Sequence, residues 1–311
     1  MPYILIPLII ILLTLIGSFV CFMIVFYARR KPETEEYPVP KGEAYEVFRE
    51  DIVSWMKDFR TLPHRCFEMR SHDGLILRAK YFEYEKGAPT EILFHGYRGS
   101  SLRDLCGGVW RCFELGRNAL VVDHRAHGES EGRIITFGVK ESLDCLDWID
   151  FFINNIDKDA KIIITGISMG AATVMMAAGK DLPENAVGVI ADCGYTCAKD
   201  IIKKVIREDI GLPANLLYPF VRLGAILFGG FDPNKASPKE SLKNTSVPVI
   251  FFHGDSDGFV PYSMSEENFS VCASQKKRLV RIEGADHGLC FPKEREKYIK
   301  ALADFFEPLL K

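Results

Sequence analysis

Ser168 stands between two glycines, Gly166 and Gly170, at the junction of two apolar segments. The β-branched run 162–164 predicts a buried strand, and the alanine- and methionine-rich run from Ala171 predicts a buried helix. A chain that turns so sharply from strand to helix needs small residues on both sides of the apex. The helix N-terminus behind the hydroxyl favours developing negative charge. This pattern therefore indicates a serine nucleophile for acyl-transfer chemistry.

Histidines and aspartates, the residue types that activate a serine, follow four other predicted strands. A serine hydroxyl is a poor nucleophile until a histidine removes its proton, and that histidine needs an acceptor for its second nitrogen. Ligands of parallel sheets gather at the carboxyl ends of strands. We therefore expect one shared site from the segments His95–Ser100, Asp123–Gly132, His253–Pro261 and Ala285–Gly288.

Taken in this order, the five motifs resemble those of the α/β-hydrolase superfamily, over about residues 66–310. More narrowly, they are similar to membrane-tethered serine hydrolases of the serine aminopeptidase and esterase-lipase groups. The resemblance implies that Ser168 is the nucleophile, Asp257 the triad acid and His287 the base. The chain order Ser, Asp, His is the one that this fold uses. Such enzymes need no cofactor, so none is expected here.

The resemblance also implies an oxyanion hole formed by the backbone N–H groups of Tyr97 and Met169. One departure from the family pattern is Ala126, where related sequences usually carry glycine. It predicts a slightly altered loop backbone and unchanged chemistry. Arg125 and Ser130, in the same segment, are expected to brace the loop after their strand.

The remaining histidines have structural interpretations. His95, His127 and His253 each precede a glycine in a strand-end loop and are expected to hydrogen-bond the backbone there. The run from Asp123 through His124 to His127 offers oxygen and nitrogen ligands for a metal. No further histidine or cysteine set completes such a site, so we expect no metal.

Two aspartates compete with Asp257 for the role of triad acid. Asp286 adjoins His287, and neighbouring side chains on an extended segment point apart. Asp255 follows a glycine directly and is expected to serve the turn. Cys290, also close to His287 in the sequence, lacks the strand-to-helix turn of a nucleophile.

The chain after residue 84 alternates predicted strands with predicted helices, which indicates an α/β fold: a mostly parallel sheet with helices on both faces. A preceding hairpin is predicted over 66–70 and 75–84, after a helix over 43–58. The other strands are expected at 91–95, 118–123, 161–166, 187–192, 247–253 and 277–282. The helices are expected at about 101–115, 139–155, 169–180, 262–273 and 292–309.

The interval 196–244 interrupts this alternation with two helical runs, 200–208 and 216–228. By resemblance it would form a small cap over the site, inserted in a hydrolase domain that spans 43–311. The second run, which includes Leu223 and Ile226, carries one charge. Two packing modes stay open for it: over an apolar substrate pocket, or against the rim of the sheet.

Residues 3–27 contain no charged side chain and are long enough to cross the ~30 Å hydrocarbon core of a membrane. A basic start and a small-residue exit, which mark a cleaved signal peptide, are missing, so a single uncleaved transmembrane anchor is expected. A polar linker is expected over 28–42. Positive residues tend to stay cytoplasmic, and Arg29, Arg30 and Lys31 follow the span. We therefore expect the hydrolase domain in the cytoplasm.

Composition excludes several classes of protein. The net charge of −3 and the mixed distribution of charges give no support for nucleic-acid binding. Nine scattered cysteines without a Cys-x-x-Cys pair argue against a disulfide framework and agree with a reducing compartment.

The sequence thus predicts a membrane-anchored serine hydrolase that cleaves a carboxylic ester, thioester or small amide. Its expected partners are a small acyl substrate and the lipid bilayer. A serine aminopeptidase is the alternative, with Glu129, Asp192 or Asp255 holding the substrate ammonium. Rivals from another class are a non-catalytic binding module on the same fold and a membrane-assembly protein with a vestigial domain.

Overall fold

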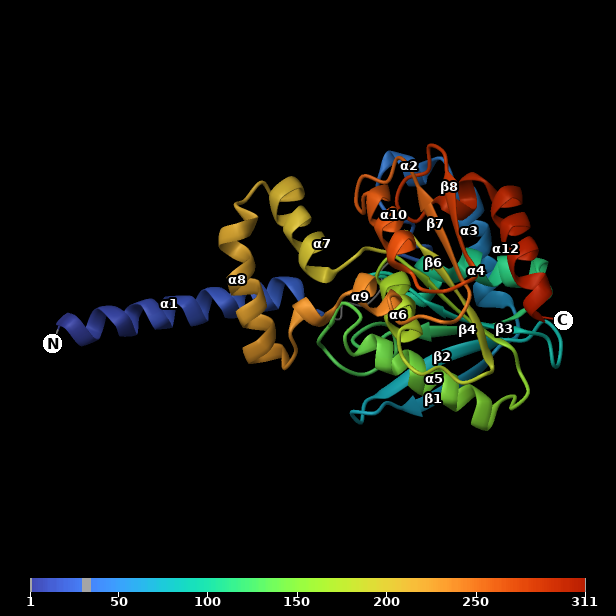
Figure 1. Cartoon of the computed structure of the whole chain (residues 1–311), viewed down its shortest axis with the longest axis horizontal. Helices are drawn as coiled ribbons and strands as arrows, with labels where there is room; N and C mark the ends of the chain where they lie inside the picture. Colours follow the sequence, from blue (N-terminus) through green and yellow to red (C-terminus); the bar gives the residue numbers. More distant parts are fainter. Residues whose placement is uncertain (1, 30–34, 311) are drawn as a thin grey trace.

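The computed structural model describes residues 2–29 and 35–310, which form a helix-covered sheet with one long helix projecting from it (Figure 1). The eight-stranded sheet has the order β1-β2-β4-β3-β5-β6-β7-β8. β2 runs antiparallel to both of its neighbours, and all later pairs are parallel. The strands are β1 Arg65–Arg70, β2 Ile76–Phe82, β3 Thr90–Phe94, β4 Asn118–Asp123, β5 Ile162–Ile167, β6 Ala186–Asp192, β7 Val249–Gly254 and β8 Lys277–Ile282.

Helices cover both faces of the sheet, as the apolar strands require. Alternate residues of β5 enter opposite cores: Ile163 packs with α3, α4 and α12, whereas Ile162 and Ile164 pack with α5 and α6. The helices of the first face are α3 Arg49–Thr61, α4 Ser101–Glu114 and α12 Arg295–Leu310, and those of the second are α5 Glu141–Asn155, α6 Met169–Ala178 and α10 Tyr262–Val271. The predicted fold class is confirmed.

Two of the predicted helices differ from the structure by more than small shifts of their ends. The helix expected over 43–58 is divided into α2 Glu43–Glu46 and α3, because Val47 and Phe48 join them in a turn. The last helix, expected over 292–309, is preceded by a separate short one, α11 Cys290–Lys293.

The interval 196–244 forms a helical insertion, called the cap below. Its helices α7 and α8 stand apart from the sheet, where α8 packs on the projecting helix α1 Pro2–Val25, whereas α9 packs on α6 (Figure 1). Its elements are α7 Ala198–Lys204, the π-helical turn η1 Val205–Asp209, α8 Ala214–Gly224, the π-helical turn η2 Ala225–Gly229, the short 3₁₀ turn η3 Pro233–Lys235 and α9 Pro238–Leu242. A Cβ at Gly224 would lie 2.2 Å from the carbonyl oxygen of Ser18, so α8 and α1 are in close contact. Of the two packing modes left open for the second run, packing on the sheet rim is not the one observed, since α8 packs on α1.

α1 has two parts with different surroundings. Leu5 to Ile16 expose their apolar side chains, whereas Phe22 and Phe26 are buried in the domain. The chain then joins the domain backbone, with the Ala28 N–H donating to the Arg133 carbonyl at 2.8 Å. Leu5–Val25 is apolar and long enough for a membrane span or a signal sequence. Arg30, Lys31 and part of the predicted linker lie outside the described residues.

Candidate active site

Ser168 occupies a strained turn between β5 and α6. Its φ of 56° is in the left-handed region, which a non-glycine residue adopts at a cost. A Cβ at Gly166 would lie 2.1 Å from the Gly170 carbonyl, and a Cβ at Gly170 would lie 2.0 Å from the Phe94 carbonyl oxygen. The two glycines therefore allow three backbone segments to meet beneath the hydroxyl.

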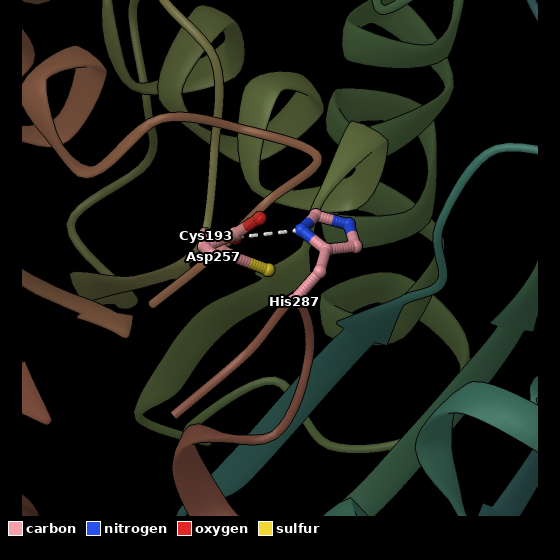
Figure 2. A group of neighbouring side chains, drawn as sticks. All are labelled: Cys193, Asp257 and His287. Atoms are coloured by element: carbon pink, nitrogen blue, oxygen red, sulfur yellow. Dashed lines mark hydrogen bonds and ion pairs between the residues drawn. The ribbon is translucent and has the colours of Figure 1, made fainter. Parts of the chain in front are cut away.

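The structure brings Ser168, His287 and Asp257 together in a chain of hydrogen bonds. The Oγ of Ser168 lies 2.9 Å from Nε2 of His287. Nδ1 of His287 lies 2.8 Å from Oδ2 of Asp257, and Figure 2 shows this second contact. A carboxylate accepts only, so Nδ1 carries the proton and Nε2 is left to accept from the serine hydroxyl. The geometry is that of a nucleophile, a base and an orienting acid.

The Asp257 carboxylate is fixed from several sides. Its Oδ1 accepts backbone N–H groups of Phe259 and Val260 at 2.9 and 2.8 Å, and its Oδ2 lies 3.2 Å from Nε2 of His253. Burial raises the pKa of the Asp257 carboxyl, but hydrogen bonds from His253 and His287 outweigh burial and hold that pKa below its usual range. This carboxylate therefore stays ionised beside the imidazole.

The two competing aspartates serve turns, as expected for Asp255. Asp255 accepts the Gly284 N–H at 2.7 Å and an Arg281 N–H at 2.8 Å. Asp286 accepts the backbone N–H groups of Gly258 at 3.1 Å and of His287 at 2.7 Å. The ring of His287 is bonded to Asp257 instead.

Two backbone N–H groups border the serine. Met169 is the first residue of α6, where a helix leaves its N–H groups unbonded. Tyr97 follows Gly96, which lies close to the site. A Cβ added at Gly96 would be 3.5 Å from the Cβ of Ser168. Among the hydrogen bonds of the described residues, the backbone N–H groups of Tyr97 and Met169 are donors in none.

The loop that carries Tyr97 is tied to the end of α1. The Tyr97 hydroxyl donates to the Val25 carbonyl at 2.7 Å, and the Arg98 guanidinium donates to the Ile24 carbonyl at 2.6 Å. Carbonyls at a helix C-terminus lack intrahelical donors and attract cations, so both bonds are favourable. The sequence did not indicate this connection, which joins residues more than 70 positions apart.

Neutral histidines support the same loop from below, as the sequence predicted. Nδ1 of His127 lies 2.9 Å from the Arg125 carbonyl and must donate, so Nε2 accepts the Arg98 N–H at 3.1 Å. His95 repeats the arrangement, with Nδ1 donating to the Gly96 carbonyl and Nε2 accepting the His124 N–H. Burial, together with nearby His95, lowers the pKa of His127 to about 3.

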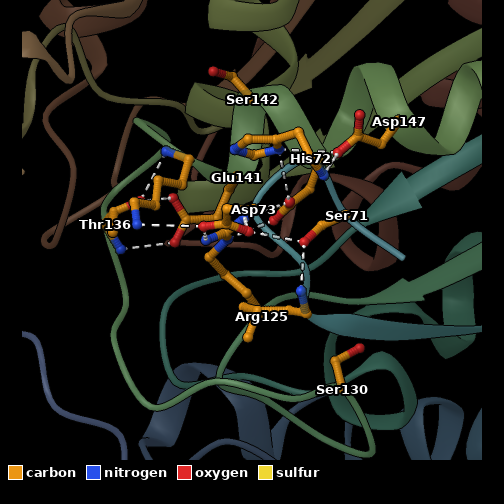
Figure 3. A network of polar contacts seen from close by, with 12 residues as sticks. Ser71, His72, Asp73, Arg125, Ser130, Thr136, Glu141, Ser142 and Asp147 are labelled. Atoms are coloured by element: carbon orange, nitrogen blue, oxygen red, sulfur yellow. Dashed lines mark hydrogen bonds and ion pairs between the residues drawn. The ribbon is translucent and has the colours of Figure 1, made fainter. Parts of the chain in front are cut away.

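The loop after β4 is braced by an ion-pair network, again as predicted (Figure 3). Arg125 donates to Asp144 at 2.6 Å and to Asp73 at 2.8 Å, and the Ser130 hydroxyl donates to the Asp123 carbonyl at 2.6 Å. His72, Asp73 and Asp144 have ligand atoms close enough to share a cation, but the Arg125 guanidinium already supplies the positive charge there.

Ala126, next to Arg125 in this loop, has a φ of 67°. It thus holds the left-handed backbone that glycine adopts freely. An alanine adopts this backbone at a cost that glycine does not have.

A cavity of about 240 Å³ adjoins Ser168 and His287. Its apolar walls come from α3, α4 and the chain before them, including Tyr45, Ile52 and Trp55. None of the described residues of 196–244 lines it, so the expectation that Leu223 and Ile226 cover the pocket is wrong. The N-terminal segment supplies this wall because its apolar side chains pack onto α4, whereas the cap packs onto α1.

Cys193 is a neighbour of the site that the sequence did not single out. Its sulfur and the ligand atoms of Asp257 and His287 lie within 4.8 Å of one another (Figure 2). Burial raises the pKa of the Cys193 thiol well above its usual value, so the sulfur stays protonated. A neutral thiol is a poor metal ligand, and Nδ1 of His287 is already engaged. The three residues therefore fit a hydrogen-bonded site better than a metal site.

Known proteins resemble this chain in sequence and in structure. A family model described as alpha/beta hydrolase fold matches residues 92–213. An uncharacterised protein YqkD of Bacillus subtilis is 28% identical over 266 residues, which are 83% of this chain and 87% of that protein. Protein bem46 of Schizosaccharomyces pombe is 24% identical over 256 residues, covering 80% and 78% of the two chains. The structure of the Pyrococcus furiosus esterase Pf2001 superposes with a TM-score of 0.66 at 21% identity, covering 87% and 96%.

The strand-to-helix turn predicts a sharp difference between two glycine substitutions. Gly166→Ala would press a methyl group into the Gly170 carbonyl, and we expect the free energy of unfolding to fall by about 3 kcal/mol. Gly258→Ala is the control because an added Cβ there meets nothing within 4 Å. Denaturant unfolding in detergent measures both, and equal stabilities would contradict the tight turn.

The buried histidines predict sensitivity to acid. Unfolded His127 titrates near pH 6.5 and folded His127 near pH 3, so the unfolded chain binds more protons between these values. The contribution of such a histidine to the free energy of unfolding is therefore fully present above pH 6.5. It falls as the pH drops, by up to ~1.4 kcal/mol per pH unit for each histidine. His127→Gln should flatten the decline in melting temperature from pH 7 to pH 5. The exposed control His64→Gln should not, and identical slopes for all three proteins would refute the assignment.

Proposed function

We propose that the chain is a serine hydrolase of the α/β-hydrolase superfamily and that it acts through an acyl-enzyme. The observation that carries the proposal is the unbroken hydrogen-bond chain from Ser168 through His287 to Asp257. Each role needs one group: a hydroxyl, an imidazole with a free nitrogen and an ionised carboxylate. All three are present in the required order.

The reaction follows from these atoms. As Oγ of Ser168 attacks the acyl carbonyl, its proton passes to Nε2 of His287. The imidazolium is stabilised by Asp257 and then gives the proton to the leaving alcohol, thiol or amine. Water, activated by the same nitrogen, hydrolyses the acyl-enzyme and restores the serine.

The negative oxygen of the tetrahedral intermediate needs donors that are already in place. We assign this role to the backbone N–H groups of Tyr97 and Met169, which border Ser168 and have no other acceptor among the described residues. One such donor is worth about 2.7–4 kcal/mol in the transition state. The N-terminus of α6 adds its dipole.

The cavity supports an acyl group that is apolar and of moderate size. At about 240 Å³ it is smaller than most pockets that hold drug-sized ligands, and its walls include Ile52, Trp55 and Phe291. We therefore favour carboxylic esters or thioesters of short to medium chains over bulky or charged acyl groups.

The aminopeptidase alternative depends on Asp192, since of its three acidic candidates only this one lines the cavity. Oδ2 of Asp192 accepts the Tyr298 hydroxyl at 3.0 Å, and no described residue binds Oδ1. Burial raises the pKa of this carboxyl, which favours a neutral group that attracts an ammonium weakly. The site thus fits an uncharged acyl substrate better. Turnover of p-nitrophenyl esters beside aminoacyl amides compares the two activities directly.

We further propose that α1 anchors the enzyme in a membrane, with the catalytic domain on the cytoplasmic side. Leu5–Val25 is long, apolar and 11% buried, and Arg29 follows it. Basic residues that flank a span tend to remain cytoplasmic. Protease digestion of sealed vesicles tests this orientation.

Substitution of the proposed nucleophile should cause a large and specific loss of activity. Ser168→Ala should abolish labelling by a fluorophosphonate probe and lower kcat for esters by about 10⁴- to 10⁶-fold. The matched control is Ser270→Ala, an exposed serine of α10, with wild-type labelling and turnover expected. Activity of Ser168→Ala within tenfold of wild type would exclude this serine as the nucleophile.

Substitution of the proposed triad acid should cause a smaller loss of activity. This loss distinguishes Asp257 from Asp255. Asp257→Asn removes the acceptor that fixes the tautomer of His287, so kcat should fall by about 10³- to 10⁴-fold at an unchanged melting temperature. Asp255→Asn alters contacts to Gly284, Arg281 and Ser256, all away from the His287 ring, and should keep nearly full activity. The reverse result would move the role of the acid to Asp255.

A further inference from the structure

α8 and η2 present an apolar stripe, Leu216, Phe220, Leu223 and Leu227, on the side that faces away from the domain. The spacing places these residues on one face of a helix. Leu216 is 65% exposed and Leu227 51% exposed. The opposite face, with Tyr218 and Val221, is buried against the cap interior. Phe220 and Leu223 are half-buried, and the exposed ends of the stripe, at Leu216 and Leu227, mark an interaction surface.

The stripe is continuous with the exposed surface of α1. Small residues let the two helices meet closely: an added Cβ at Gly17 would lie 3.5 Å from Phe220, and one at Gly224 would touch the Ser18 carbonyl. The rings of Phe19 and Phe228 also meet, with centroids 5.1 Å apart. Figure 1 shows α8 lying across α1 near the end that enters the domain.

The length of α1 determines whether the contact between α1 and α8 lies inside the membrane. A span needs about 20 residues, so all of Leu5–Val25 is required to cross a bilayer. Gly17 is eight residues before Val25, or about 12 Å at ~1.5 Å per residue, and Phe22 is about 5 Å before it. The part of α1 that contacts α8 therefore lies inside the membrane boundary, and α8 is brought there with it.

The low charge of α8 and η2 agrees with a position at the boundary of the membrane. Ala214–Gly229 contains one charged residue, Arg222, whose guanidinium pairs with Asp232 at 2.7 Å. The segment is about 24 Å long, too short to span, and the helices 214–229 and 233–242 are bent by 100° at the break between them. It can lie in the interface plane but cannot cross the bilayer.

We propose that the lipid bilayer covers this stripe, so that the cap is a second, interfacial membrane contact beside α1. The inference rests on the membrane attachment proposed above. In this arrangement α8 lies in the plane of the membrane, and its apolar face enters the boundary between headgroups and acyl chains. The catalytic domain is then held at a fixed distance from the bilayer.

The test is lipid photocrosslinking of the full chain in phosphatidylcholine vesicles. A phosphatidylcholine with a diazirine in its acyl chain is activated by light, and adducts are mapped to peptides by mass spectrometry. We expect adducts on α1 and on peptides of residues 212–228. Peptides of α12, at the end of the domain opposite α1 (Figure 1), should carry at least tenfold fewer.

Each other outcome has a distinct meaning. Adducts on α1 without adducts on 212–228 would overturn the inference and leave the anchor intact. Adducts on neither segment would overturn the anchor and the inference together.

Two variants keep the test independent of folding. Leu216→Glu and Leu227→Glu change exposed side chains, so the melting temperature in detergent should be unchanged. They should lower the adducts on 212–228 at least fivefold and leave those on α1 unchanged. Asn154→Glu on α5 is the matched control, with no change expected in either segment. Equal adduct yields for all variants would refute an acyl-chain contact.

Discussion

The site depends on the contact of three backbone segments beneath Ser168. Gly170 approaches the Phe94 carbonyl so closely that a Cβ there would lie 2.0 Å away, and Gly166 is equally close to Gly170. The contact holds the end of β3 against the first turn of α6. Because the loop with Tyr97 begins directly after β3, the same contact places that loop beside the serine. The positions of the hydroxyl and of the proposed oxyanion donors thus share one steric cause.

Local signals in the sequence predicted the sheet because its strands are buried on both faces. Buried parallel strands must be continuous apolar runs, so 118–123 was predicted with the boundaries that the structure has. The edge strand 277–282 was predicted equally well, although its residues alternate in exposure. The residues of the hydrogen-bond chain were also identifiable, although His287 lies 119 positions from Ser168 and 30 from Asp257. Strand-end motifs indicate the edge of the sheet where they meet.

The cap and the pocket wall were not predictable in the same way. An apolar helical face shows that something covers it, but periodicity does not say what. The run with Leu223 fits a pocket, a sheet rim or another helix equally well, and its contact with α1 depends on small residues some 200 positions away. Trp55 and Tyr45 enter the pocket wall only because α3 packs against α4, a tertiary contact without a local signature.

α1 is the element through which these features become connected. Its carbonyls at Ile24 and Val25 accept hydrogen bonds from Arg98 and Tyr97, and its preceding turns hold the cap. The strain stored at Ser168 and Arg98, both with left-handed backbones, is sustained by neighbours that include this helix. A helix that inserts in a bilayer would then orient the cap and the proposed oxyanion loop at once. The membrane attachment and the chemistry would share one structural support, with α1 acting as part of the catalytic domain as well as its anchor.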